Sequence, residues 1–221
     1  MYSNYNQAPP RHSSYNAHPP AHGGYGAHRP PSAAYGGHQQ HGPPAGADAQ
    51  LWQWFSNVDS DKSGSITATE LQNALVNGDW SRFDLDTVKM LMSIFDTDRS
   101  GTINFTEFAG LWKYISDWQK VFRHFDTDRS GSIEGRELAE ALRSFGYHLS
   151  PQILRLIEIK YASQPVANGY GPPPGITFDR FVRACVTVKT LTEAFQRVDT
   201  DRDGWVTIGY EQFMSIVLSA P

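Results

Sequence analysis

The stretch DTDRSGSIEGRE at residues 126–137 occurs three times in this chain with small changes. DSDKSGSITATE at 59–70 and DTDRSGTINFTE at 96–107 keep aspartate at positions 1 and 3, serine at 5, glycine at 6, isoleucine at 8 and glutamate at 12. An internal repeat of this kind indicates that one structural unit is used several times along the chain. The repeat therefore decides the fold.

The shared positions place oxygen atoms at the spacing that a calcium ion requires. Calcium takes six to eight oxygen ligands at about 2.3–2.6 Å, and side chains at positions 1, 3 and 5 converge on it from a curved backbone. The glycine permits the sharp turn, position 7 adds its carbonyl, and the glutamate at 12 adds two oxygens. These are EF-hand loops. The expected ligands are Asp59, Asp61, Ser63, Ser65 and Glu70; Asp96, Asp98, Ser100, Thr102 and Glu107; and Asp126, Asp128, Ser130, Ser132 and Glu137.

The three complete loops differ at position 9. The third loop has Glu134 there, whereas the first has Thr67 and the second has Asn104. Because more ligand charge generally gives tighter calcium binding, we expect the third loop to bind most tightly and the first to follow. Nothing in its sequence marks the second loop as inactive.

A fourth match, DTDRDGWVTIGY at 199–210, begins like the others and ends differently. Asp199, Asp201, Asp203 and the carbonyl of Trp205 can hold a cation weakly, but position 12 is a tyrosine. The apolar residue expected at position 13 comes two residues late, as if two residues were inserted and Gln212 stood in place of the clamping glutamate. We expect no tight calcium binding in this loop.

The gap between residues 137 and 199 predicts one more unit, with a degenerate loop at about 162–180. Ile176 fits position 8 and Arg180 fits position 12, but the acids are missing and GYGPPPG is present. This loop should not bind calcium. Eighteen residues follow position 12 before the next loop at both 108–125 and 181–198, so one helix of about 27 Å can serve two consecutive hands at each place.

Composition divides the chain into two regions. Residues 1–47 contain no Val, Ile, Leu, Phe or Trp, so they cannot bury enough apolar surface to offset about 1–2 kcal/mol per residue of backbone ordering. We expect a disordered tail at 1–47 and a five-hand domain at 48–221. The fold class is all-α, with short β bridges between paired loops.

The charge and the cysteine content exclude several classes of protein. The domain carries 17 basic and 23 acidic residues, a formal charge of −6, which argues against a nucleic-acid surface. A single cysteine excludes an intrachain disulfide. No long apolar run or signal peptide is present, so we expect a cytoplasmic protein, with nuclear and peripheral membrane locations also allowed. Cys185 has no histidine within reach in the sequence, and we expect it to pack in the core. We expect His124 and His148 to be structural, and we expect no enzyme activity.

An odd number of hands predicts pairing between two chains. Residues at position 8 bridge paired loops, so Ile66 should pair with Ile103, and Ile133 with Ile176. Val206 of the fifth hand is left over, and apolar residues follow it in FMSIVL. Because an exposed apolar surface is unfavourable in a monomer, we expect a twofold dimer. The expected contact residues are Val206, Phe213, Met214 and Val217.

The chain resembles the penta-EF-hand family. Five consecutive hands, shared long helices and the segments WKYISDWQKVFRHFDTDRSG, SFGYHLS and DTDRDGWVTIGYEQF carry the resemblance over about residues 48–221. The resemblance implies homodimers or heterodimers with other members. It also implies a groove that binds Pro- and Tyr-rich peptides when calcium is bound.

The expected function is a calcium sensor and adaptor that recruits Pro-rich partners in vesicle traffic or membrane repair, with calcium-dependent membrane association. Calcium should move the exit helices and open apolar surface. Aromatic residues of the predicted helices are core or groove candidates: Trp52, Trp54, Phe55, Trp80, Phe83, Trp112, Tyr114, Trp118 and Phe122. The alternatives are a regulatory subunit of a calpain-like protease, which shares this architecture, and a calcium buffer.

The tail has its own repeat. Tyr5, Tyr15, Tyr25 and Tyr35 recur every ten residues, with His18, His28 and His38 in step. Such a segment is typical of a flexible spacer. A ligand for Pro-reading partners, a phase-separation or membrane-contact segment and an intramolecular competitor for the groove stay open as alternatives.

Overall fold

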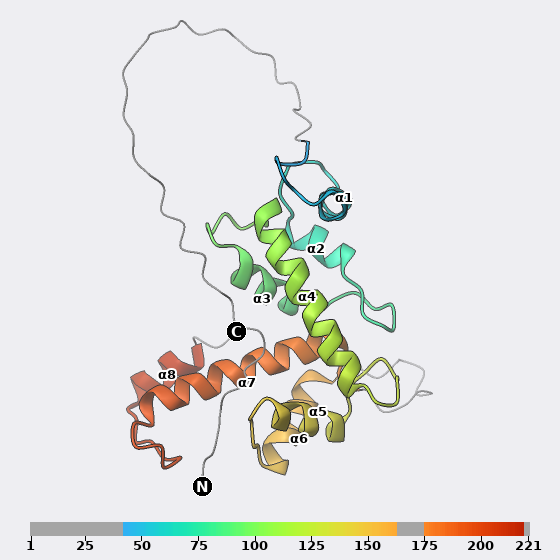
Figure 1. The fold of residues 1–221 in the computed structure, drawn as a ribbon. Coiled ribbons are helices and arrows are strands. Elements are labelled where there is room, and N and C mark those ends of the chain that lie inside the picture. The colour runs from blue at the N-terminus through green and yellow to red at the C-terminus, as the bar shows by residue number, and fades with distance from the viewer. Residues whose placement is uncertain (1–41, 163–174, 219–221) are drawn as a thin grey trace, which may run out of the picture.

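A computed structural model describes residues 42–162 and 175–218, and these residues contain eight helices (Figure 1). The β structure of the described residues consists of isolated bridges. The prediction of an all-α fold is confirmed. The helices are α1 (Ala49–Val58), α2 (Ala68–Ala74), α3 (Leu85–Phe95), α4 (Phe105–Phe125), α5 (Gly135–Ser144), α6 (Pro151–Tyr161), α7 (Phe178–Val198) and α8 (Tyr210–Leu218).

Each complete loop lies between two of these helices. The first aspartate of each loop caps the end of the entering helix: Asp59 caps α1, Asp96 caps α3 and Asp126 caps α4. The exit helix then begins at position 10, and the residue at position 9 is its N-cap. Hand one is therefore α1–α2, hand two is α3–α4, and hand three is α4–α5.

Two long helices are shared between hands, as the spacing predicts. Helix α4 ends hand two and begins hand three, and α7 ends hand four and begins hand five. Each has 21 residues. Neither these nor the shorter helices of residues 42–162 and 175–218 are long and apolar enough to span a membrane.

The predicted loop pairs are present. Ile66 and Ile103 exchange two backbone hydrogen bonds of 2.8 Å, and Ile133 and Ile176 exchange bonds of 2.8 and 2.9 Å. Three of these side chains are fully buried and Ile176 is 2% exposed. A further bridge joins Val76 to Arg82 and forms a short hairpin between α2 and α3, which the sequence did not lead us to expect.

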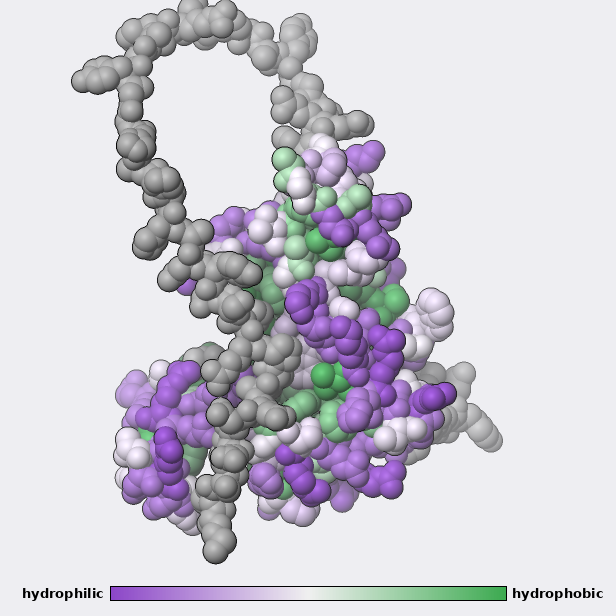
Figure 2. Space-filling view, viewed as in Figure 1, coloured by the Kyte–Doolittle hydropathy of each residue, from purple (hydrophilic) through white to green (hydrophobic). Residues whose placement is uncertain are grey.

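The core is rich in aromatic side chains from α1, α3, α4 and α7. Phe55, Phe83, Trp118 and Phe122 are all buried, so four of the groove candidates lie in the core. Trp52, Trp54, Trp112 and Tyr114 are partly buried, whereas Trp80 is 85% exposed. On the face drawn in Figure 2, hydrophobic side chains appear between hydrophilic ones near α1 and α2.

Two predictions fall on residues that the structure does not describe. The tail at 1–47 and its ten-residue repeat lie outside the described residues except for 42–47. Most of the degenerate fourth loop, residues 163–174, lies outside them as well. Both stay predictions.

Candidate metal centres

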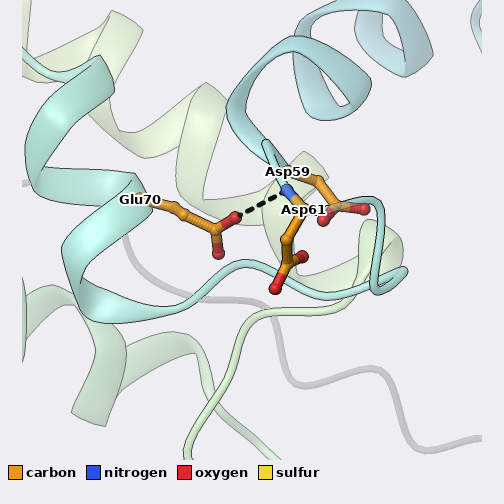
Figure 3. A group of neighbouring side chains, drawn as sticks. All are labelled: Asp59, Asp61 and Glu70. Atoms are coloured by element: carbon orange, nitrogen blue, oxygen red, sulfur yellow. Dashed lines mark hydrogen bonds between the residues drawn. The ribbon is translucent and has the colours of Figure 1, made fainter.

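Each of the three complete loops brings three carboxylates together. One oxygen from each member lies within 4.8 Å of the others, and the groups are Asp59, Asp61 and Glu70; Asp96, Asp98 and Glu107; and Asp126, Asp128 and Glu137. Figure 3 shows how Glu70 reaches from α2 toward the two aspartates of its loop. The side chains that sequence spacing predicts as ligands therefore converge.

The glutamate at position 12 is held from both ends of its loop. In hand one, Oε2 of Glu70 accepts a hydrogen bond of 2.9 Å from the N–H of Thr67, the N-cap of α2, and Oε1 accepts one of 2.9 Å from the N–H of Ser60. Glu107 and Glu137 make the equivalent pairs of bonds. The carboxylate thus joins the start of the exit helix to the start of the loop.

These donors also set the charge of Glu70. Burial alone would raise its pKa, but the N–H and hydroxyl of Thr67 and the hydroxyl of Ser60 lower the pKa to about 2. Hydrogen bonds to the charged form of a carboxyl favour that form. Glu70 is therefore ionised at neutral pH, as a calcium ligand must be.

The oxygens expected from positions 5 and 7 lie next to each other. The hydroxyl of Ser63 donates to the carbonyl of Ser65 at 2.9 Å, and the hydroxyl of Ser130 donates to the carbonyl of Ser132 at 2.9 Å. Ser100 and Thr102 repeat the contact at 3.2 Å. In Ser65, Thr102 and Ser132, the atom that accepts these hydrogen bonds is the main-chain carbonyl oxygen, which is also the calcium ligand expected at position 7.

The first half of the loop has the same backbone geometry in hands one, two, three and five. Position 4 has a left-handed φ of 57–59° at Lys62, Arg99, Arg129 and Arg202. The glycine at position 6 has a φ of 80–85°, a region that a side chain makes unfavourable. The loop of hand five therefore turns as the three complete loops do.

The aspartate at position 1 separates the hands into two kinds. In hands one and two its Oδ1 accepts the N–H of the position-5 serine, at 3.0 Å for Asp59 and 2.9 Å for Asp96. Oδ1 of Asp126 and of Asp199 is buried and has no hydrogen-bond partner among the described residues. Burial raises the pKa of Asp126. A bound cation would compensate this oxygen.

The donor sets fit calcium. Calcium prefers hard oxygen ligands, and each complete loop offers three carboxylates, a hydroxyl and a carbonyl within one curved segment. The ranking of the three complete hands by calcium affinity stays a prediction.

Comparison with known proteins identifies the family. The model of the EF-hand domain pair matches residues 48–113 and 115–218. A sorcin from Schistosoma japonicum is 47% identical over 73% of this chain and 90% of its own length. The chain belongs to the penta-EF-hand family. It is a calcium-binding EF-hand protein.

Other penta-EF-hand proteins show the same likeness. Peflins from Xenopus laevis and Homo sapiens are 38% and 40% identical over 80% and 81% of this chain. The chain spans only about three fifths of their length, 64% and 61%. A solved structure, of a homolog of programmed cell death 6 protein from Leishmania major, superposes with a TM-score of 0.63 at 30% identity, covering 76% of this chain and 92% of that one.

The fifth hand of this penta-EF-hand chain has a different exit. Helix α8 begins at Tyr210, position 12 of the loop, whereas the other exit helices begin at position 10. The delay of two residues agrees with the insertion inferred from the sequence, and it puts Gln212 third in α8, where Glu70 is third in α2. The carboxylate cluster of this hand consists of Asp199, Asp201 and Asp203 alone.

Hand five also exposes most of its apolar side chains. Helix α8 has no buried residue, and Phe213, Val217 and Leu218 are 50%, 44% and 75% exposed. Figure 1 shows α8 and the outer part of α7 projecting away from the other helices. Two residues of α7 that we did not select from the sequence, Leu191 and Phe195, are also exposed, at 39% and 36%. Their spacing of four residues on a predicted helix was the available signal.

Cys185 packs in the core, as expected. It is 2% exposed, and burial raises the pKa of its thiol, which makes it unreactive. His124 and His148 are exposed.

Proposed function

We propose that this protein is a calcium-dependent adaptor without enzyme activity, in which hands one to three bind calcium and hand five joins two chains. The ligands are those assigned above to loops 59–70, 96–107 and 126–137. The observation that carries the dimer is the exposed apolar surface of hand five. An exposed cluster of large apolar side chains in a soluble protein is typical of an interaction site.

The geometry of the other hands supports pairing between chains. Hands one and two, and hands three and four, bury their position-8 residues in a bridge. Val206 is only half-buried, and no bridge from it is present in the described residues. Pairing two fifth hands about a twofold axis would supply the missing bridge and cover Phe213, Met214 and Val217 in both chains. The partner is a second copy or another penta-EF-hand protein.

Sedimentation equilibrium of the Phe213→Glu/Val217→Glu variant tests this dimer. Losing apolar contacts and burying carboxylates should raise the dimer dissociation constant at least about 100-fold. The control is Leu156→Glu/Ile159→Glu on α6, which replaces residues that are 56% and 70% exposed. The control should remain dimeric. A variant that still sediments as a dimer would contradict the assignment.

The fifth loop is proposed as a weak cation site. It has the same backbone turn as the binding loops, and Oδ1 of the buried Asp199 finds no hydrogen-bond partner within residues 42–162 and 175–218. Asp201, Asp203 and the carbonyl of Trp205 complete the donors. Gln212→Glu would add a carboxylate at the third position of α8, and we expect calcium affinity in this loop to rise about tenfold by calorimetry. An unchanged affinity would show that α8 lies too far from the loop.

The adaptor role needs a surface for partners, which we propose to be Pro-rich segments. Trp80 is 85% exposed in a left-handed conformation with φ 66°, which is unfavourable for a large side chain. Trp54 and Trp112 lie 4.8 Å apart between their ring centroids and are partly exposed. Such rings suit a polyproline peptide, whose conformation is already stiff. The proposed setting is the cytoplasm, the nucleus or the surface of membranes during vesicle traffic or repair.

A pull-down with the full chain, in calcium and in chelator, tests the adaptor role. Pro-rich proteins should appear with calcium only, and Trp80→Ala should reduce their recovery. Recovery of a large calpain-like protease chain would favour the regulatory-subunit alternative. A dye that fluoresces on apolar surfaces distinguishes an adaptor from a calcium buffer. Dye binding should increase with calcium for an adaptor, whereas a buffer should expose no new apolar surface.

A further inference from the structure

Arg180 links the two ends of hand four that the structure describes. Ala162 caps the end of α6, the place that the first aspartate of the loop takes in the other hands. Arg180 is the third residue of α7, where the clamping glutamate takes the third place of an exit helix. Its Nη1 donates a hydrogen bond of 2.8 Å to the carbonyl of Ala162. The two ends of the fourth loop are thus joined by a side chain.

In this contact the side chain is the hydrogen-bond donor, whereas in the binding hands the side chain at the same place is the acceptor. There the glutamate accepts an N–H from the start of the loop, as Glu137 does from Thr127 at 2.8 Å. Here a guanidinium donates to a carbonyl. The side chain at this place therefore carries a positive charge, whereas the glutamate of a binding hand carries a negative one.

The same side chain reaches the entering helix of hand two. Nη2 of Arg180 lies 3.4 Å from Oδ2 of Asp84, the N-cap of α3, and Nη1 of Arg183 lies 3.3 Å from Oδ1 of Asp84. Arg183 also contacts Asp86 at 3.2 Å. The arginine side chains are about one quarter exposed, so water screens these pairs only in part.

Beneath the ion pairs lies a buried hydrogen-bond network. Asp179 is 1% exposed, and its Oδ2 accepts the N–H of Asp84 at 2.6 Å. Its other oxygen accepts the hydroxyl of Thr177 at 2.6 Å, and its own N–H donates to Oδ1 of Asn77 at 3.1 Å. A buried carboxylate is costly unless such donors satisfy it. The network therefore requires α7, α3 and the α2–α3 hairpin to stay together.

Apolar packing completes the junction. The rings of Phe83 and Phe178 lie 5.7 Å apart in an edge-to-face arrangement, and both are buried. Leu91 of α3 and Val182 of α7 line the same small gap and are also buried. Polar and apolar contacts thus fasten the same two helices.

We propose that Arg180 is the resident cation of hand four and that, with Asp179, Asp84 and Arg183, it locks α3 and α7 into one rigid unit. Helix α3 is the entering helix of hand two, and α7 is the entering helix of hand five. When calcium binding in hand two changes the position of α3 relative to α4, hand five therefore moves together with α3. The coupling rests on the proposed calcium site of hand two, but the lock itself does not. Arg180 is a positioning residue in this device.

Distances between spin labels test the lock in the full-length chain. In a Cys185→Ala background, labels at the exposed residues Lys89 and Gln196 report α3 against α7, and labels at Lys89 and Gln119 report α3 against α4. Excess unlabelled chain removes distances between protomers. We expect calcium to shift the α3–α4 distance and to leave a narrow α3–α7 distance unchanged. An α3–α7 distance that shifts with calcium would overturn the lock.

Arg180→Gln tests the role of the guanidinium. In chelator it should broaden the α3–α7 distribution at least about twofold relative to the parent, and Arg180→Lys should restore part of the order. Arg155→Gln, which changes an exposed arginine of α6, is the control and should have no effect. If the α3–α7 distance distribution of Arg180→Gln is as narrow as that of the control, the proposed lock is wrong. If the α3–α4 distance does not change with calcium but Arg180→Gln still broadens the α3–α7 distribution, the proposed calcium site of hand two is wrong and the lock is supported.

Discussion

Hands three and five begin alike and end differently. Both follow a 21-residue helix, both start at a helix-capping aspartate, and both pass through the same left-handed turn. In hand three the exit helix starts at position 10 and brings Glu137 onto the loop, whereas in hand five it starts two residues later. The first half of the repeat therefore fixes the turn, and the second half decides whether a clamp forms.

The two hands also differ in what covers them. Ile133 is fully buried because the backbone of hand four pairs with it, whereas Val206 is half-buried and α8 buries none of its residues. The same position of the repeat thus becomes core only where a partner loop is present. Matched substitutions in hands three and five should therefore have unequal effects on stability and on calcium binding.

Truncating the position-8 residue should have the largest effect on stability. Ile133→Ala removes a fully buried side chain from the bridge to Ile176, and should lower the free energy of unfolding by about 2–5 kcal/mol. Val206→Ala should cost less than about 1 kcal/mol in the monomer, because the Val206 side chain is only partly buried. Urea denaturation at low protein concentration measures both. Equal losses would show that hand five is packed within its own chain.

Neutralising the glutamate at position 12 should have the second largest effect, which is on calcium binding. Glu137→Gln removes a charged ligand from hand three, and the calcium affinity of that hand should fall at least about 100-fold, or about 2.7 kcal/mol. Glu211→Gln removes the only glutamate of α8, which lies outside the carboxylate cluster of hand five. It should leave calorimetric titrations unchanged. Similar losses in both variants would mean that Glu211 is a ligand.

Adding one methyl group to a glycine should have a smaller effect. A Cβ on Gly175 would clash with the Oγ and Cβ of Ser132, across the bridge between hands three and four. Gly175→Ala should therefore destabilise the chain by about 1–3 kcal/mol. Gly209→Ala is the matched change in hand five, where a Cβ meets nothing within 4 Å. It should be neutral in thermal unfolding, and a large loss there would reveal a contact on that loop.

The sequence predicted those features that follow from spacing. Positions 1, 3, 5, 8 and 12 of the repeat specified three carboxylate clusters and two bridges, because each of them depends on a local turn and a fixed interval. The 18-residue intervals likewise predicted α4 and α7. The late start of α8 was readable from the displaced Phe213.

Features that depend on contacts between distant segments were not predicted. Arg180 was seen only as a residue that cannot clamp calcium, and its contact with Asp84 joins positions 96 residues apart. No period in the sequence links the α2–α3 hairpin to α7. The aromatic residues were also ambiguous, because burial of Trp118 and exposure of Trp80 depend on which helices pack over them.

Native mass spectrometry of the full chain at limiting calcium tests the central claim most directly, because one spectrum gives both the assembly and its ions. The proposed function predicts a dimer that fills the three complete loops in each of its two chains before any ion enters hand five, whose exit helix brings no carboxylate to its cluster. The Phe213→Glu/Val217→Glu variant should appear as a monomer with three ions. A wild-type monomer, or a dimer in which a complete loop stays empty while hand five fills, would contradict the account.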